Sequence, residues 1–228
     1  RNITSIGSYT FASNLLTELT IPDSVTSIGD NAFQDNQLVN VTIPDSVTSI
    51  GVSAFASNQL TTLAIPDSVT SIGSYAFDSN KLTSVKYPGG DVRIGVGIFY
   101  FNQLTSVTFE DNVISISPRT FFKNQLTGVS IPDSVTTIGE RAFYDNLLTA
   151  VKIPNGVTII GDYSFSDNQI ASVTISSGVT NIGDGAFFNN QLNTLAIPES
   201  VISIGDNAFR GNQLASVSIG GNVVSIGR

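Results

Sequence analysis

The chain of 228 residues contains no cysteine, histidine, methionine or tryptophan. Without cysteine there are no disulfides and no thiol nucleophile, and either redox compartment is compatible with the chain. Without histidine the commonest acid–base catalyst and metal ligand is missing, so we expect no enzyme, no metal site and no cofactor. No apolar run approaches the roughly 20 residues of a membrane span, so we expect no membrane insertion.

Positive charge is also scarce: ten lysines and arginines face 18 acidic residues, for a net charge of −8. Because phosphate binding needs a basic stripe, we expect no nucleic-acid partner. One carboxylate per copy falls short of the roughly six to eight oxygens that Ca²⁺ takes, so we interpret the recurring acidic position as turn chemistry. That position holds Asp23, Asp45, Asp67, Asp111, Asp133 and Glu199.

What the chain does contain is one unit copied about ten times. A phenylalanine recurs every 22 residues from Phe11 to Phe209, and an isoleucine from Ile6 to Ile226, without insertion or deletion. This register predicts a single array over residues 1–228 in which each coil stacks on the next. Since the chain begins and ends in mid-repeat, with no polar caps and no visible signal peptide, we expect it to be a fragment of a longer protein.

Each unit predicts a strand on one side and irregular structure on the other. Residues 16–21 alternate in polarity, which is typical of a short half-buried strand, and Pro22 ends it in a turn. Residues 25–28 predict a second short extended piece. Gly29, replaced in one copy by Ser117, indicates a backbone conformation easiest for glycine. Residues 30–33 predict a single helical or 3₁₀ turn that points a phenyl ring inward.

Asparagine shares the 22-residue spacing. A buried side-chain amide has two donors and a two-lone-pair acceptor, so stacked amides can bond to one another and to loop backbone. We therefore expect a structural ladder rather than a ligand site. Its members are Asn14, Asn36, Asn58, Asn80, Asn102, Asn124, Asn146, Asn168, Asn190 and Asn212.

The combined pattern L-x-x-L-x-I-P-x-x-V-x-x-I-G-x-x-A-F-x-x-N, carried in full by residues 16–36, resembles the BspA-type leucine-rich repeat. The resemblance implies a right-handed solenoid with short parallel β-strands on its concave face, mainly β and irregular in structure. It also implies secreted or cell-surface proteins of bacteria or parasitic protists, which attach to host matrix proteins, other microbes or host cells. That family often has cysteine where this chain has the asparagine column.

The departures from the repeat lie mid-chain. The position after the recurring phenylalanine is usually polar or small, but it is aromatic in three consecutive copies, with basic residues beside it. Residues 87–98, next to these copies, are irregular. Aromatic and arginine side chains make up binding hot spots, and an aromatic strip also suits sugars, although such rings can simply stack on each other. The candidate binding residues are Tyr100, Phe101, Arg119, Phe122, Lys123, Arg141 and Tyr144.

Two functions follow from these features. The first is a non-catalytic protein-binding or adhesion module of a secreted or cell-surface protein. Its partner would be another protein, such as a host extracellular-matrix or cell-surface protein, with carbohydrate as a second ligand class. The alternative is a passive spacer or stalk in a large surface protein. The near-identity of the copies favours the spacer, and the aromatic and basic departures favour binding.

Overall fold

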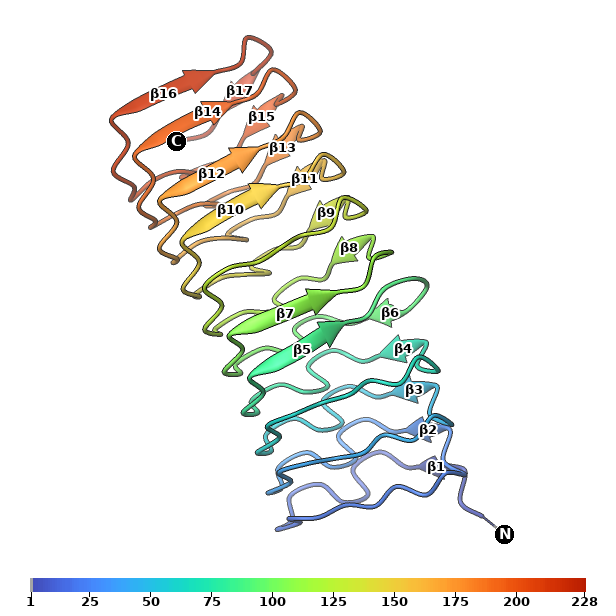
Figure 1. Ribbon diagram of the computed structural model, residues 1–228. Helices are drawn as coiled ribbons and strands as arrows, with labels where there is room; N and C mark the ends of the chain where they lie inside the picture. The colour runs from blue at the N-terminus through green and yellow to red at the C-terminus, as the bar shows by residue number, and fades with distance from the viewer. Residues whose placement is uncertain (1) are drawn as a thin grey trace.

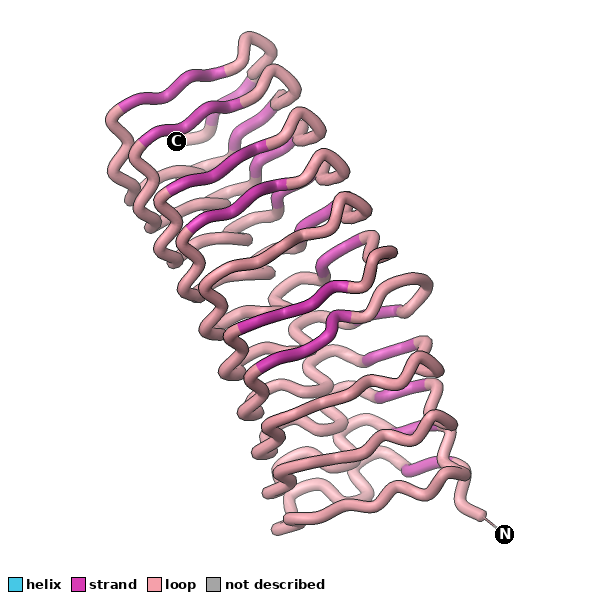
Figure 2. The backbone as a smooth tube through the Cα atoms, in the orientation of Figure 1, coloured by secondary structure: helices cyan, strands magenta, loops and turns pink. Residues whose placement is uncertain are grey.

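The computed structural model describes residues 2–228 as one stack of coils that runs from the N-terminus to the C-terminus (Figure 1). All paired strands are parallel and join residues one repeat apart, as Ser5 pairs with Ser27 and Ala150 with Ser172. Within residues 2–228 the structure contains strands, turns and loops but no helix (Figure 2), and no helical segment there could cross a membrane. The solenoid expected from the repeat is confirmed.

The strands are of two lengths and lie on two sides of the coil. Two-residue strands form a five-stranded sheet, β1-β2-β3-β4-β6, and a six-stranded sheet, β8-β9-β11-β13-β15-β17. Their bounds are β1 (Ser5–Ile6), β2 (Ser27–Ile28), β3 (Ser49–Ile50), β4 (Ser71–Ile72), β6 (Arg93–Ile94), β8 (Ser115–Ile116), β9 (Thr137–Ile138), β11 (Ile159–Ile160), β13 (Asn181–Ile182), β15 (Ser203–Ile204) and β17 (Ser225–Ile226). We call this side of the coil the second sheet.

Four-residue strands form the other side, in the pairs β5–β7, β10–β12 and β14–β16. Their bounds are β5 (Ser84–Tyr87), β7 (Ser106–Phe109), β10 (Ala150–Ile153), β12 (Ser172–Ile175), β14 (Thr194–Ile197) and β16 (Ser216–Ile219). In this orientation they lie in front of the second sheet (Figure 1).

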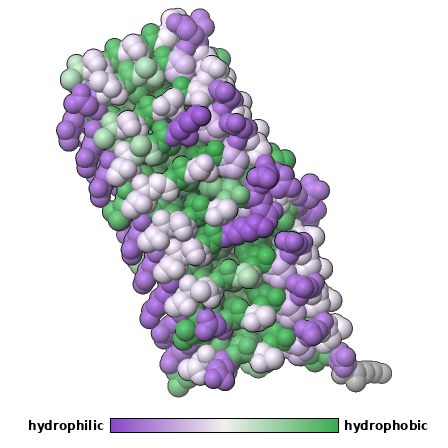
Figure 3. All heavy atoms as spheres, in the orientation of Figure 1, coloured by the Kyte–Doolittle hydropathy of each residue, from purple (hydrophilic) through white to green (hydrophobic). Residues whose placement is uncertain are grey.

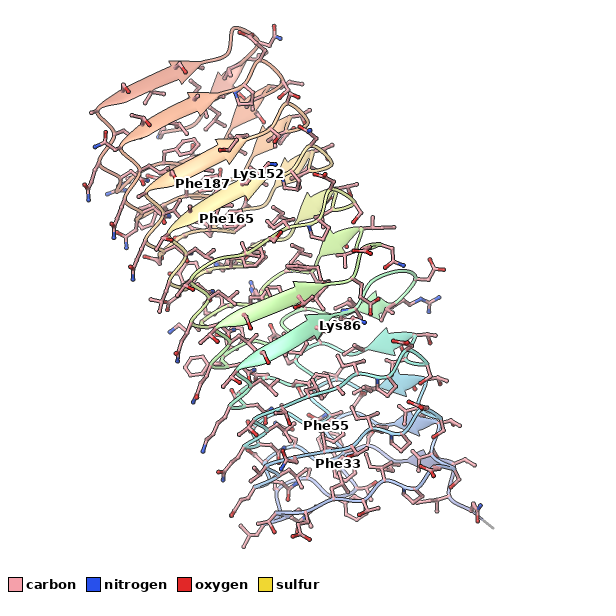
Figure 4. All side chains as sticks on the ribbon, in the orientation of Figure 1. Phe33, Phe55, Lys86, Lys152, Phe165 and Phe187 are labelled. Atoms are coloured by element: carbon pink, nitrogen blue, oxygen red, sulfur yellow. The ribbon has the colours of Figure 1, made fainter. Side chains whose placement is uncertain are left out.

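The core between the two sides is a column of stacked phenyl rings. Phe33, Phe55, Phe165 and Phe187 lie inside the coil (Figure 4), and each is fully buried. Successive ring centroids are 5.2 to 6.1 Å apart. Offset stacks of this kind add roughly 0.5–1.5 kcal/mol per pair beyond the area they bury. The two faces of each inner ring are covered by the rings of the neighbouring coils. A single coil would leave both faces exposed, so the coils are stable only when they are stacked.

The predicted front strand is wrong for four copies. Residues 16–21, 38–43, 60–65 and 126–131 contain no strand. Their inter-repeat backbone hydrogen bonds are confined to the start of each segment, as when Gln37 N–H donates to the Leu16 carbonyl at 2.9 Å. The remaining residues run extended without a ladder to the next coil.

The expected reason for the glycine column is also wrong. Gly29 has no left-handed backbone; instead, a Cβ there would lie 2.6 Å from the backbone nitrogen of Ser8 in the preceding coil. Close approach of two chains therefore excludes a side chain.

The predicted helical turn over residues 30–33 is replaced by two β-turns. Ala32 N–H donates to the Gly29 carbonyl and Gln34 N–H to the Asn31 carbonyl, at 3.3 and 3.2 Å. Asn31 has a φ of 55°, and this left-handed residue stops a helical turn from forming. The phenyl ring still points inward, as expected.

Candidate functional site

The candidate binding residues lie on one flank of the stack, in the turns that frame the buried phenylalanine. Two columns of this flank have left-handed backbone in each coil, with φ between 50° and 77°. The first column is Tyr9, Asn31, Ser53, Tyr75, Gly97, Arg119, Arg141, Tyr163, Gly185 and Asn207, and the second is Ser13, Asp35, Ser57, Ser79, Phe101, Lys123, Asp145, Asp167, Asn189 and Gly211.

Four of the predicted site residues occupy these left-handed columns. They are Phe101, Arg119, Lys123 and Arg141, with φ of 54°, 57°, 53° and 52°. A left-handed conformation costs an ordinary L-residue roughly 1–2 kcal/mol, and glycine or asparagine avoids most of that cost. Of the 16 other members of the two columns, six are glycine or asparagine and the rest are serine, aspartate or tyrosine. The left-handed backbone therefore belongs to every coil, and what distinguishes these four positions is their long aromatic or basic side chains.

Tyr100, Phe122 and Tyr144, which we call the aromatic strip, lie between the two columns. The ring centroids of Tyr100 and Phe122 are 4.7 Å apart, with 15° between the planes. Those of Phe122 and Tyr144 are also 4.7 Å apart, at 11°. The three rings therefore stack face to face, and because their side chains are half-buried, part of each ring remains open to solvent.

Phe101 and Lys123 border the strip. Phe101 is 51% exposed. The Lys123 ammonium lies 5.5 Å from its ring centroid, within cation–π range, and the Tyr100 ring lies 6.0 Å away. Lys123 also pairs with Asp145 at 3.8 Å. The cation is therefore held over an exposed aromatic ring by its neighbours.

A second charged group lies on the other border of the strip. Arg119 donates to a carboxylate oxygen of Glu140 at 3.1 Å, and Arg141 contacts the same oxygen. The Arg141 guanidinium also lies 5.2 Å from the ring centroid of Tyr163. Hydrogen bonds to Tyr75 and Glu140 raise the pKa of Arg119, so it stays charged. The guanidinium groups of Arg119 and Arg141 share one carboxylate, so both keep N–H donors that a ligand could use.

Burial also changes the titration of the strip itself. Partial burial, followed by a hydrogen bond with Asp167, raises the pKa of Tyr144 to about 12. Burial and the nearby Asp78 raise the pKa of Tyr100. Both phenols are therefore neutral donors at physiological pH.

The seven candidate residues thus lie together on one surface, which we call the aromatic–basic cluster. Sequence reasoning missed three residues that complete it: Tyr75, Glu140 and Tyr163. Tyr75 and Tyr163 share the 22-residue column of Arg119, so the period could have indicated both. Glu140 takes the position before Arg141, where most other copies place small, apolar or acidic residues, and nothing in the pattern distinguishes it.

The asparagine column lies inside the coil rather than at this surface. Asn36 and the seven members that follow it up to Asn190 are 4–8% exposed. Each side-chain amide bonds to backbone: Asn124 Oδ1 accepts from Leu104 N–H, and its Nδ2 donates to the carbonyls of Phe99 and Phe122. Within residues 2–228 the asparagines of this column make no hydrogen bond to one another, unlike the amide-to-amide contacts expected.

The recurring acidic position lies in the expected turns. Val25 N–H donates to the Pro22 carbonyl at 3.0 Å, and Ser24 Oγ donates to the Ile3 carbonyl of the preceding coil at 2.6 Å. Among residues 2–228, no group of three or more histidine, cysteine, aspartate or glutamate side chains could hold a metal ion. These turns therefore tie coils together.

The front face offers less chemistry than the flank. Residues of intermediate and high hydropathy lie along the middle of this face, and hydrophilic residues gather along its edges (Figure 3). Lys86 and Lys152 rise from β5 and β10 (Figure 4). Lys86 pairs with Glu110 at 2.7 Å, which neutralises one of the two charges.

The family of the chain is decided by its match to a family model. The model described as "BspA type Leucine rich repeat region (6 copies)" matches residues 4–127 and again residues 114–228. The chain belongs to the BspA-type leucine-rich repeat family. Both matches run through the aromatic–basic cluster or up to it, so the cluster belongs to repeats of the family rather than to an inserted segment.

Solved leucine-rich repeat structures share the fold at low sequence identity. The pneumococcal vaccine antigen PcpA matches with a TM-score of 0.71 and 22% identity, over 99% of this chain and 63% of that one. A leucine-rich repeat protein from Bacteroides ovatus matches with a TM-score of 0.57 and 20% identity, over 99% and 79%. YopM from Yersinia enterocolitica matches at 0.58 and 18%, over 94% and 49%. A comparison with curated proteins finds no match.

Proposed function

We propose that this leucine-rich repeat array is a non-catalytic protein-binding module of a secreted or cell-surface protein, and that the aromatic–basic cluster is its contact surface. The observation that carries the proposal is that long aromatic and basic side chains gather around the stacked strip. Phe101, Arg119, Lys123 and Arg141 occupy backbone that favours glycine or asparagine, and they border the stacked strip.

The composition of the cluster suits a protein partner. Aromatic and arginine side chains supply most of the binding energy in protein interfaces. A sugar would need an open ring face for stacking, but both faces of Phe122 are covered by Tyr100 and Tyr144. The edges and hydroxyls of the strip remain available, and they suit the mixed apolar and polar surface of a protein.

Adhesion is the form of binding that the family resemblance favours. The proposed partner is a host extracellular-matrix or cell-surface protein, and the source is a bacterium or a protist. The chain spans 63% of the length of PcpA, so segments outside it would contribute to the activity of such a protein.

The test is a pull-down with immobilised extracellular-matrix proteins. The strip variant combines Tyr100→Ser, Phe122→Ser and Tyr144→Ser. Its matched control combines Gln34→Ser, Phe188→Ser and Arg210→Ser, which change the same turn position in other coils. We expect the strip variant to lose at least about tenfold in affinity, and the control to bind as the unaltered chain does.

Two other outcomes have clear meanings. If the strip variant and the unaltered chain bind equally, the cluster is not the contact surface. If the unaltered chain captures none of the matrix proteins, the passive spacer becomes the better interpretation. Unfolding curves of both variants are needed alongside, because loss of the strip also removes the stacking of Tyr100 on Phe122 and Phe101 and of Phe122 on Tyr144.

A further inference from the structure

Tyr87 is buried where most other coils place an aliphatic residue at the end of the front segment. Its side chain is fully buried, and its hydroxyl crosses the coil to the second sheet. The hydroxyl accepts a hydrogen bond from Ser117 N–H at 3.1 Å and donates to the Ser115 carbonyl at 3.3 Å. A front-side residue is therefore bonded to the backbone of the second sheet, in the next coil.

The second sheet is interrupted at this place. β6 ends the five-stranded sheet and β8 begins the six-stranded one, and the two strands do not pair. In the next coil Gly139 N–H donates to the Ile116 carbonyl at 2.9 Å. Ser117 N–H donates to the Tyr87 hydroxyl instead, while Ser117 Oγ donates to the Ile94 carbonyl at 3.0 Å.

The side chain of Ser117 explains the interruption. A Cβ at Gly139 would lie 2.6 Å from the backbone nitrogen of Pro118, so the regular spacing admits only glycine. Ser117 has a Cβ, and β8 therefore cannot approach β6 as closely as the other strands approach each other. A cavity of about 90 Å³, lined by Tyr87, Ile94 and Ser115 among others, lies at the boundary.

The phenyl column is loosened in the same coil. Phe99 lies 6.1 Å from Phe77 and 6.1 Å from Phe121, whereas the other successive rings are 5.2–5.7 Å apart. Ile98 is buried in this coil at a position where most other coils have alanine. The larger side chain separates the layers.

The flank, by contrast, continues across the boundary without interruption. Phe101 N–H donates to the Phe122 carbonyl at 2.9 Å, and Leu104 N–H donates to Asn124 Oδ1 at 3.0 Å. The front side is also bonded at this boundary, because β5 pairs with β7. The second sheet alone is interrupted, and there a phenol and a serine hydroxyl join the two coils.

We propose that the boundary between the β6 and β8 coils is a hinge, and that Tyr87 is its latch. The hinge closes when the Tyr87 hydroxyl bridges Ser117 and Ser115, and it opens when the hydroxyl releases them. The Tyr100–Phe122 stack crosses the same boundary, so hinge opening changes the shape of the aromatic strip. The hinge itself does not depend on what the strip binds.

The test is amide hydrogen exchange of the full chain, comparing Tyr87→Phe with Tyr100→Phe as the control phenol. In Tyr87→Phe we expect the Ser117 amide to exchange about tenfold or more faster, while the Gly139 and Gly205 amides keep their rates. Unchanged exchange at Ser117, or an equal increase along the whole array, would overturn the proposal.

A second variant checks the cause. Tyr87→Ile with Ser117→Gly restores the regular residues of the repeat at both positions, so β6 and β8 can pair directly. We expect protection of the residue 117 amide to rise to that of Gly139. If the residue 117 amide of this double variant exchanges as fast as that of Tyr87→Phe, the Ser117 side chain is not the cause of the interruption, and the proposed hinge mechanism is wrong.

Discussion

Asn124 Oδ1 accepts a hydrogen bond from the backbone N–H of Leu104, 20 residues earlier, at 3.0 Å. The same amide donates to the carbonyl of Phe99, also in the preceding coil. Since both backbone groups are buried, Asn124→Ala leaves a donor and an acceptor without partners. We expect this change to lower the free energy of unfolding by about 1–3 kcal/mol, measured by denaturant titration.

The control for this prediction is Asn14→Ala. Asn14 is exposed, and its amide donates only to the Phe11 and Ala12 carbonyls of its own coil. Water can replace those bonds, so we expect a loss below about 0.5 kcal/mol. Equal losses at Asn14 and Asn124 would contradict a role for the amide in joining coils.

Phe101→Asn tests whether the left-handed positions carry strain. Asparagine tolerates the φ of 54°, and relief of about 1 kcal/mol should offset the lost contact with Lys123. Phe122→Asn, at the next coil's strip position, removes two ring contacts with no such relief and should lose about 1–3 kcal/mol. Thermal or denaturant unfolding of the pair distinguishes them, and a larger loss for Phe101→Asn would refute the strain.

Tyr144→Phe tests the raised pKa of the strip. A phenol whose folded pKa lies above its unfolded value near 10 contributes stability at lower pH and loses it as pH rises through the folded value, about 12. The unaltered chain should therefore lose more stability than Tyr144→Phe as pH rises from 10 to about 12. Unfolding titrations across that window check this, and parallel curves would show that the Tyr144 environment is ordinary.

Glu110→Gln should loosen the irregular loop at residues 88–91. A hydrogen bond from Lys86 and a second from Gly89 N–H lower the pKa of Glu110 below 4.5. Its contribution is therefore present above that pH and is lost as pH falls through the folded value. We expect faster exchange of the Gly89 amide in the variant at neutral pH, whereas Asp111→Asn, one residue later, should leave the amide unchanged.

The 22-residue period was enough to predict the fold, because each column has one environment and stacking forces all copies into it. Phe33 points inward and Asn36 is buried in the way their chemistry requires. The period could not show which partner a buried amide bonds to, because another side-chain amide and a backbone carbonyl can both accept its hydrogen bond. The period also did not predict the backbone dihedral angles. Gly29 is needed because the backbone of the preceding coil lies close to it, whereas Asn31 has the left-handed φ.

The candidate site was predicted from residues that depart from the repeat. A single departure indicates the position of a residue less firmly than a residue type that recurs in every copy. Tyr100, Phe122 and Tyr144 were visible because three neighbouring copies changed together. Tyr87 and Phe109 are the two aromatic members of a column that is otherwise isoleucine. Nothing in that change indicates that the Tyr87 hydroxyl bonds to Ser117. Contacts across the coil depend on side-chain length and direction, which a one-dimensional period does not contain.

The asparagine bonds that join coils all run from the asparagine of one coil to the backbone of the coil before it. The asparagine of a coil leaving the ribosome therefore finds those backbone partners already made. Synthesis runs from the N-terminus at roughly 5–20 residues per second, so one coil emerges every second or few. The array can thus be closed turn by turn as it is translated, which limits the time that any apolar layer lies open to a wrong partner.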